Sequence, residues 1–201
     1  MSLFDRVADA ARNLSFLKTL IKAVNKGNVG AVKALLAEGA DSNQKDGDGN
    51  TALICAAIGN RAGIVKLLLD KGADVNAQNN AGDTALIVTA RKGYTEIARL
   101  LLDKGAGLDK QNNLGDTALI LSAGNGHAKI VRLLLERGVR LYDENNNRST
   151  AQIKALRNND AEIVQMLNEE HRARQQLAEE KARAKIRAKA EEREGKKSGD
   201  A

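Results

Sequence analysis

The stretch GDTALIVTARKGYTEIARLLLDKGA, residues 82–106, decides the fold of this chain. It opens with turn-forming residues, and Thr84 follows them as a candidate helix N-cap. Apolar residues then recur at helical spacing in two short segments, which Gly93 separates and Gly105 ends. The stretch therefore predicts a turn followed by two short helices.

The same pattern returns every 33 residues along most of the chain. Three residue types keep this period at different phases: Thr51, Thr84, Thr117 and Thr150; Gly39, Gly72, Gly105 and Gly138; and Leu35, Leu68, Leu101, Leu134 and Leu167. A fixed period of this length is typical of stacked repeats rather than of one globular core. Helices this short are marginal alone in water, so we expect the repeated leucines to form the core between neighbouring units.

The repeated segments resemble the ankyrin repeat family. The resemblance is carried by residues 82–87, 93–97 and 100–106, and it extends over about residues 14–168. The family typically has Thr-Pro-Leu-His where this chain has Thr-Ala-Leu-Ile, as at residues 51–54. Alanine can open a helix without the fixed φ of proline, so we expect the fold to survive the change. The resemblance implies an all-α, ankyrin-type helical repeat solenoid with about five repeats.

Both ends of the repeat array depart from the pattern in ways that suit capping units. Residues 1–13 are predicted to form an N-terminal capping helix, because Leu3, Phe4 and Val7 fall on one side of it. In the fifth repeat Arg148 stands where the other repeats have a turn glycine, and Gln152 where they have a core leucine. A terminal repeat has no neighbour beyond it and needs a polar outer face.

The segment 169–201 is predicted to be a charged, net basic helical tail. It is rich in Ala, Glu, Arg, Lys and Gln, and no glycine interrupts it before Gly195. Lys and Arg exceed Asp and Glu by four in residues 171–201 and by two in residues 1–170, which together give the net charge of +6. We therefore expect a long C-terminal helical extension that continues the last helix of the repeats.

Three interpretations of the basic tail remain open at this point. It could be a solvated extension, a contact for an acidic protein, or a contact for phosphates in nucleic acid or on another anionic surface. The candidate contacts are Lys181, Arg183, Lys185, Arg187 and Lys189.

The residue types that carry catalysis are scarce. The one cysteine, Cys55, lies in an apolar run and is predicted to be a small buried residue. The two histidines have no zinc-ligand spacing; His127 is expected to be structural and His171 solvated. No phosphate-binding loop occurs. We therefore expect no catalytic residues, no metal and no cofactor, and a protein that is not an enzyme.

No membrane span is expected either, because no segment approaches the roughly 18 apolar residues that a bilayer requires. The N-terminal residues lack the unbroken apolar run of a secretory signal. The single cysteine is typical of a reducing compartment. A cytoplasmic location is therefore predicted.

The resemblance implies a surface for a partner, since ankyrin proteins usually hold another protein with their hairpin tips and inner helices, on the concave side. Position by position, the candidate contacts at the hairpins are Asp48, Asn50, Ala81, Asp83, Leu114 and Asp116, and those at the ends of the inner helices are Ile58, Arg91, Lys92 and Asn125. Two alternatives remain: the aspartates could be only turn formers, and Leu114 could pack on a neighbouring hairpin.

The predicted function is therefore a non-catalytic protein–protein interaction module, that is, an adaptor, scaffold or inhibitor that binds another protein on its concave face. The alternative is a binder of nucleic acid or an anionic surface through the basic C-terminal tail.

Overall fold

The computed structural model describes residue 15 and residues 19–199, with side chains through residue 188. The helices with assigned bounds are α2 (Val29–Ala37), α3 (Ala52–Ile58), α4 (Ala62–Asp70), α5 (Ala85–Lys92), α6 (Thr95–Asp103), α7 (Ala118–Gly124), α8 (Ala128–Glu136), α9 (Ala151–Arg157) and α10 (Ala161–Gly199). These described ranges contain no strand. The all-α prediction is confirmed, while the predicted capping helix at residues 1–13 lies outside the described residues.

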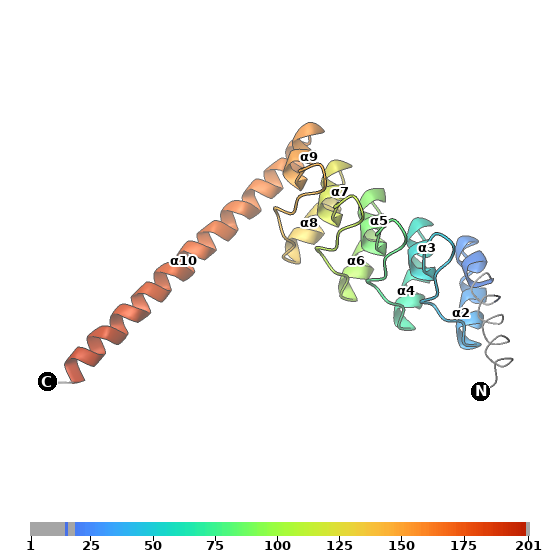
Figure 1. The fold of residues 1–201 in the computed structure, drawn as a ribbon, viewed down its shortest axis with the longest axis horizontal. Coiled ribbons are helices and arrows are strands. Elements are labelled where there is room, and N and C mark those ends of the chain that lie inside the picture. The colour runs from blue at the N-terminus through green and yellow to red at the C-terminus, as the bar shows by residue number, and fades with distance from the viewer. Residues whose placement is uncertain (1–14, 16–18, 200–201) are drawn as a thin grey trace.

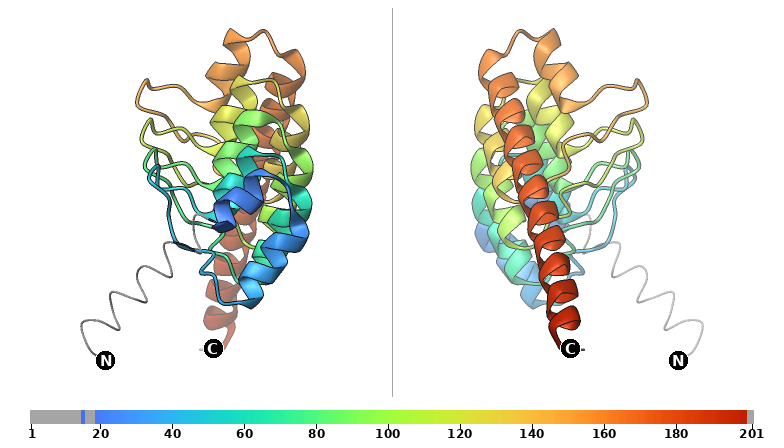
Figure 2. Two further views of the ribbon diagram at one scale, coloured as in Figure 1. Left: turned by 90° about the vertical axis from the view of Figure 1, so that its right-hand side faces the viewer. Right: turned by 90° about the vertical axis from the view of Figure 1, so that its left-hand side faces the viewer.

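The helices form two layers that run the length of a stack (Figure 1). The first helices of successive repeats, α3, α5, α7 and α9, contact one another in chain order and form the inner layer. The second helices, α4, α6, α8 and α10, do the same in the outer layer. The hairpins that join one repeat to the next project from one side of both layers (Figure 2). This arrangement is the predicted helical repeat solenoid.

Each inner helix from α3 onward begins at the repeated threonine. The hydroxyl oxygen of Thr84 accepts a hydrogen bond from the backbone N–H of Ile87 at 3.2 Å. The same cap recurs at Thr51, Thr117 and Thr150 with distances of 3.2–3.3 Å. Such a cap satisfies one of the donors that a helix start leaves open, and its loss typically costs about 1 kcal/mol. The predicted N-cap role of the threonines is confirmed.

The repeated leucines form the core, as predicted, except that Leu35 is only partly buried against it. Leu68, Leu101 and Leu134 in the outer layer have no exposed surface, and Leu53, Leu86 and Leu119 in the inner layer are 1% exposed. Burying one such side chain contributes about 1.5–3 kcal/mol. In the fifth repeat Gln152 takes the place of the inner leucine and donates a hydrogen bond to Asn168 Oδ1 at 2.8 Å. The cap therefore replaces an apolar contact with a polar one.

Successive hairpins touch through their backbones. The N–H of Asn80 donates to the carbonyl of Asp48 at 3.0 Å, and equivalent bonds join the next hairpins. The glycine of each tip lies under this contact: a Cβ on Gly82, whose φ is +76°, would be 2.7 Å from the backbone nitrogen of Asn113. Arg148 holds this position in the fifth repeat with φ +54°. Among the described residues no further hairpin stacks on Arg148, so the space that requires glycine elsewhere is open there.

The last helix, α10, begins as the outer helix of the fifth repeat and then leaves the stack (Figure 1). Arg174 fastens its first turns, since Nη1 donates to the carbonyl of Val139 at 2.8 Å and Nε to Glu170 at 2.7 Å. The ring of His171 meets that of Tyr142 edge to face at 5.5 Å, and Tyr142 Oη and His171 Nδ1 are hydrogen-bonded. His171 is thus half-buried against Tyr142 rather than fully solvated as predicted, and the long C-terminal extension is confirmed.

Candidate partner-binding face

Three of the predicted partner contacts are buried at the base of the hairpins. Asn50, Asp83 and Asp116 are 9%, 6% and 8% exposed. Each accepts a hydrogen bond from an asparagine side chain of the next repeat. The bonds are Asn79 Nδ2 to Asn50 Oδ1 at 2.9 Å, Asn112 Nδ2 to Asp83 Oδ1 at 2.9 Å, and Asn145 Nδ2 to Asp116 Oδ1 at 2.7 Å. These three residues hold one hairpin to the next.

Arg91, a fourth predicted contact, is tied to the hairpin of its own repeat. Its Nη1 and Nη2 donate to the two carboxylate oxygens of Asp83, each at 2.7 Å. The hydrogen bond to Asp83 raises the pKa of Arg91, burial opposes the rise, and the charges of Asp83 and Asp116 add to it. A two-bond pair of this kind is both strong and directional. Arg91 therefore fixes the hairpin against α5.

The other six predicted contacts remain at the surface. Ile58, at the end of α3, is 45% exposed, and Leu114, at a hairpin tip, is 65% exposed. This exposure excludes the alternative that Leu114 is packed away against a neighbouring hairpin. The remaining exposed candidates are Asp48 and Ala81 at the tips, and Lys92 and Asn125 at the ends of the inner helices. The hairpins and the exposed ends of the inner helices are called the concave face from here on.

Cys55 is buried beneath this face, as predicted. Burial, helped by the negative charge of Asp46, raises the pKa of its thiol to about 12. The thiol lies 3.9 Å from Asp46 Oδ2. The thiolate is the reactive form of cysteine, so the Cys55 thiol, which stays protonated at neutral pH, is unreactive there.

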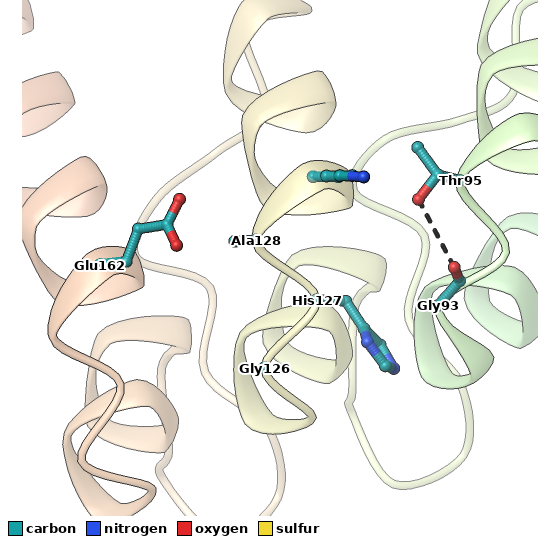
Figure 3. A pocket seen from close by; sticks show the side chains of 7 residues that line it. Gly93, Thr95, Gly126, His127, Ala128 and Glu162 are labelled. Atoms are coloured by element: carbon teal, nitrogen blue, oxygen red, sulfur yellow. Dashed lines mark hydrogen bonds between the residues drawn. The ribbon is translucent and has the colours of Figure 1, made fainter.

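The surface is also hollowed where α6, α8 and α10 begin (Figure 3). A cavity of about 430 Å³ is lined by Gly93, Thr95, Gly126, His127, Ala128, Lys129 and Glu162. Two of its polar side chains have partners within the fold: Thr95 Oγ1 donates to the carbonyl of Gly93 at 3.4 Å, and His127 Nε2 lies 3.2 Å from the carbonyl oxygen of Arg91. The lining therefore shows no nucleophile paired with a base. His127 has the structural contact expected of it.

The described part of the chain contains no group of three His, Cys, Asp or Glu side chains that could hold a metal ion. No helix there is both long and apolar enough to cross a bilayer.

The candidate tail contacts lie along the part of α10 that has left the stack. Lys181, Arg183, Lys185 and Arg187 are exposed, and the side chain of Lys189 lies outside the described residues. At about 100° per residue, Lys181 and Lys185 share one side of the helix while Arg183 and Arg187 lie nearly opposite. The charge therefore surrounds the helix and forms no single stripe.

The layers, hairpins and period define a helical repeat protein. A family model described as ankyrin repeats (3 copies) matches residues 20–112 and again residues 104–178. The chain therefore belongs to the ankyrin repeat family. Ankyrin repeats are generally protein–protein interaction modules, and the family is typically non-catalytic. Comparison with curated proteins gives no significant match.

Two features of the face escape the sequence-based prediction. The first is the asparagine ladder of Asn79, Asn112 and Asn145, whose signal was available because these residues also recur every 33 positions. The second is Gly124, which stands where the preceding repeat has Arg91. Its importance depends on the pairing of Arg91 with Asp83, which no spacing in the sequence indicates.

Proposed function

We propose that this chain is a non-catalytic interaction module that binds another protein on its concave face. The observation that supports the proposal is a set of exposed side chains that the fold does not use, above all Leu114 at 65% exposure. The same face carries exposed charged residues such as Asp48 and Lys92. An exposed aliphatic residue on a face that also carries charge is a common anchor at protein interfaces.

Hydrogen bonds within the stack order the base of the concave face. Asn50, Asp83, Arg91 and Asp116 hydrogen-bond within the stack and hold the hairpins in register. A surface that is already ordered loses little conformational entropy when a partner binds. The proposed contacts are therefore the exposed set: Asp48, Ile58, Ala81, Lys92, Leu114 and Asn125.

The test uses the full chain as bait in a lysate of its native host. A variant with Lys92→Glu and Leu114→Asp changes only exposed residues of the concave face. A control with Lys66→Glu and Arg99→Glu likewise introduces two acidic residues, on α4 and α6 of the outer layer. Capture of a partner should fall with the first variant and persist with the control. Equal capture by the first variant and the unmodified chain would refute the proposal.

This mode of action suits an adaptor, scaffold or inhibitor, since each of these works by binding alone. The alternative function, binding of nucleic acid or an anionic surface through the tail, gains no support from the fold or the comparisons. The cytoplasmic location stays a prediction, which fractionation of host cells would check.

A further inference from the structure

The third repeat (α5 and α6) and the fourth repeat (α7 and α8) place an aspartate at the same position but treat it differently. Asp83 accepts the Asn112 amide and two hydrogen bonds from Arg91. The residue 33 positions after Arg91 is Gly124. Within the described part of the chain, the one hydrogen bond to the Asp116 side chain therefore comes from Asn145, at 2.7 Å.

Because Asp116 is buried, having fewer hydrogen-bond donors than Asp83 is energetically unfavourable for its carboxylate. Asp116 is 8% exposed and Asp83 is 6% exposed, so both residues are largely buried. A carboxylate pays for that desolvation unless hydrogen bonds or an opposite charge replace the water. Among the described residues, the Asp83 carboxylate accepts three hydrogen bonds, whereas the Asp116 carboxylate accepts one, from the neutral amide of Asn145. Asp116 is thus a buried charge that a further donor would stabilise.

The neighbouring repeats show which donor fits. Arg91 reaches back from the end of α5 to Asp83, and Arg157 reaches back from the end of α9 to Ser149 Oγ, where Nη1 donates at 3.2 Å. In both cases a guanidinium covers the residue that precedes the N-cap threonine. The fourth repeat, which lies between them, has the carboxylate and lacks the side chain that would cover it.

The backbone at Gly124 leaves room for a Cβ. The three atoms nearest to such a Cβ belong to the aliphatic stem of Lys154, at 3.5–3.7 Å, which is ordinary van der Waals contact. No ion pair within 4.0 Å joins the Lys154 ammonium to Asp116 among the described residues. Arg91 adds a favourable charge from the side, but its Nη1 and Nη2 both donate to Asp83.

We propose that this open position receives an arginine side chain of the partner protein, whose guanidinium hydrogen-bonds to Asp116 as Arg91 does to Asp83. The inference rests on the proposed function and specifies the chemistry of its partner. Arginine is favoured over lysine because its planar fork presents paired N–H donors to one carboxylate. Leu114, exposed at the tip of the same hairpin, offers an apolar contact to a neighbouring residue of the partner.

The experiment needs no identified partner. The isotope-labelled full chain is titrated with N-acetyl-arginine amide while NMR follows the Asn145 side-chain amide and the Gly124 backbone amide. Saturable shifts of both signals are expected, and N-acetyl-citrulline amide, which has the same shape without the charge, should give none. Asp116→Asn should weaken binding about tenfold, since it keeps the shape and removes the charge. Unsaturated shifts, or equal binding by Asp116→Asn, would overturn the inference.

A second variant fills the position from within the chain. Gly124→Arg should place a guanidinium over Asp116 and abolish binding of the probe, with circular dichroism confirming the fold. Gly63→Arg on α4, where a Cβ meets nothing within 4 Å, adds the same charge elsewhere and should leave probe binding unchanged. Probe binding that survives Gly124→Arg would contradict the inference.

The two proposals fail separately. If the Lys92→Glu and Leu114→Asp variant loses its partner while Asp116→Asn neither weakens partner capture nor changes probe binding, the concave face stands and the arginine position falls. If the probe binds saturably at Asp116 and the Lys92→Glu and Leu114→Asp variant captures the partner as well as the unmodified chain does, the arginine position stands and the concave-face proposal falls.

Discussion

Asp83 and Arg91, eight residues apart in the chain, close the base of one hairpin with two hydrogen bonds of 2.7 Å. The carboxylate is buried and the guanidinium is partly exposed. Removing the arginine would leave a buried charge with one amide donor, which is far more costly than losing an exposed ion pair. The pair therefore belongs to the scaffold, although the sequence predicts both residues as partner contacts.

Arg91→Ala is accordingly expected to lower the free energy of unfolding by about 1–3 kcal/mol. Urea unfolding followed by circular dichroism measures this loss. The control is Arg99→Ala, which truncates an exposed arginine on α6 and should change stability by less than about 0.5 kcal/mol. Equal losses of unfolding free energy in the two variants would show that the Arg91–Asp83 pair contributes no more to stability than an exposed arginine does.

The sequence predicts well those features that every repeat shares. Thr84 caps its helix and Leu101 is buried because each repeat gives these positions the same neighbours. The period alone therefore identifies the caps, the core and the order of the helices. The long extension is likewise predictable, since no glycine or proline stops α10 where the repeats end.

The partner-binding residues are harder to predict because their exposure depends on the neighbouring repeat. Asp83 occupies a turn, where aspartate is commonly exposed, and becomes buried because Asn112 of the next hairpin lies against it. Leu114 and Ala81 hold the same repeat position, and neither their type nor their spacing indicates that both stay exposed. Contacts between repeats decide which varying positions remain available to a partner.

Gly82 and Gly105 differ in how closely neighbouring atoms approach them, and the stability of their alanine variants would measure this difference. Gly82 and Gly105 have nearly equal positive φ values of +76° and +80°. A Cβ on Gly82 would meet the backbone of Asn113 at 2.7 Å, whereas a Cβ on Gly105 would meet nothing within 4 Å. Gly105→Ala should cost about 1 kcal/mol for its backbone conformation alone. Gly82→Ala should cost about 1–3 kcal/mol more, because the next hairpin must move.

Thermal unfolding of the two glycine variants isolates the contact between hairpins, since the conformational cost is common to both. A similar fall in melting temperature for Gly82→Ala and Gly105→Ala would mean that the hairpins can separate freely.

The buried thiol predicts a dependence of stability on alkaline pH. The pKa of Cys55 is raised from 9.0 to about 12, chiefly by burial and further by the charge of Asp46. Between these values the unfolded chain releases the thiol proton while the folded chain keeps it, so the unfolded state gains stability. The thiol therefore lowers the free energy of unfolding as pH rises from 9, by up to about 1.4 kcal/mol per pH unit.

Cys55→Ala removes this contribution. Urea unfolding of both proteins at about pH 8 and about pH 10 should show a smaller fall for the variant, while lysine and tyrosine titrations affect both alike. Parallel losses of stability would place the thiol pKa near its ordinary value.

Arg174 is expected to govern how firmly α10 is joined to the stack. Its guanidinium reaches the carbonyl of Val139 and the carboxylate of Glu170, and so ties the helix to the loop that follows α8. Arg174→Ala should lower the free energy of unfolding by about 1–2 kcal/mol and speed hydrogen exchange in the first turns of α10. Arg172→Ala is the matched control, because Arg172 is exposed on the same helix. If both variants exchange at the rate of the unmodified chain, the contacts of Arg174 do not fasten the helix.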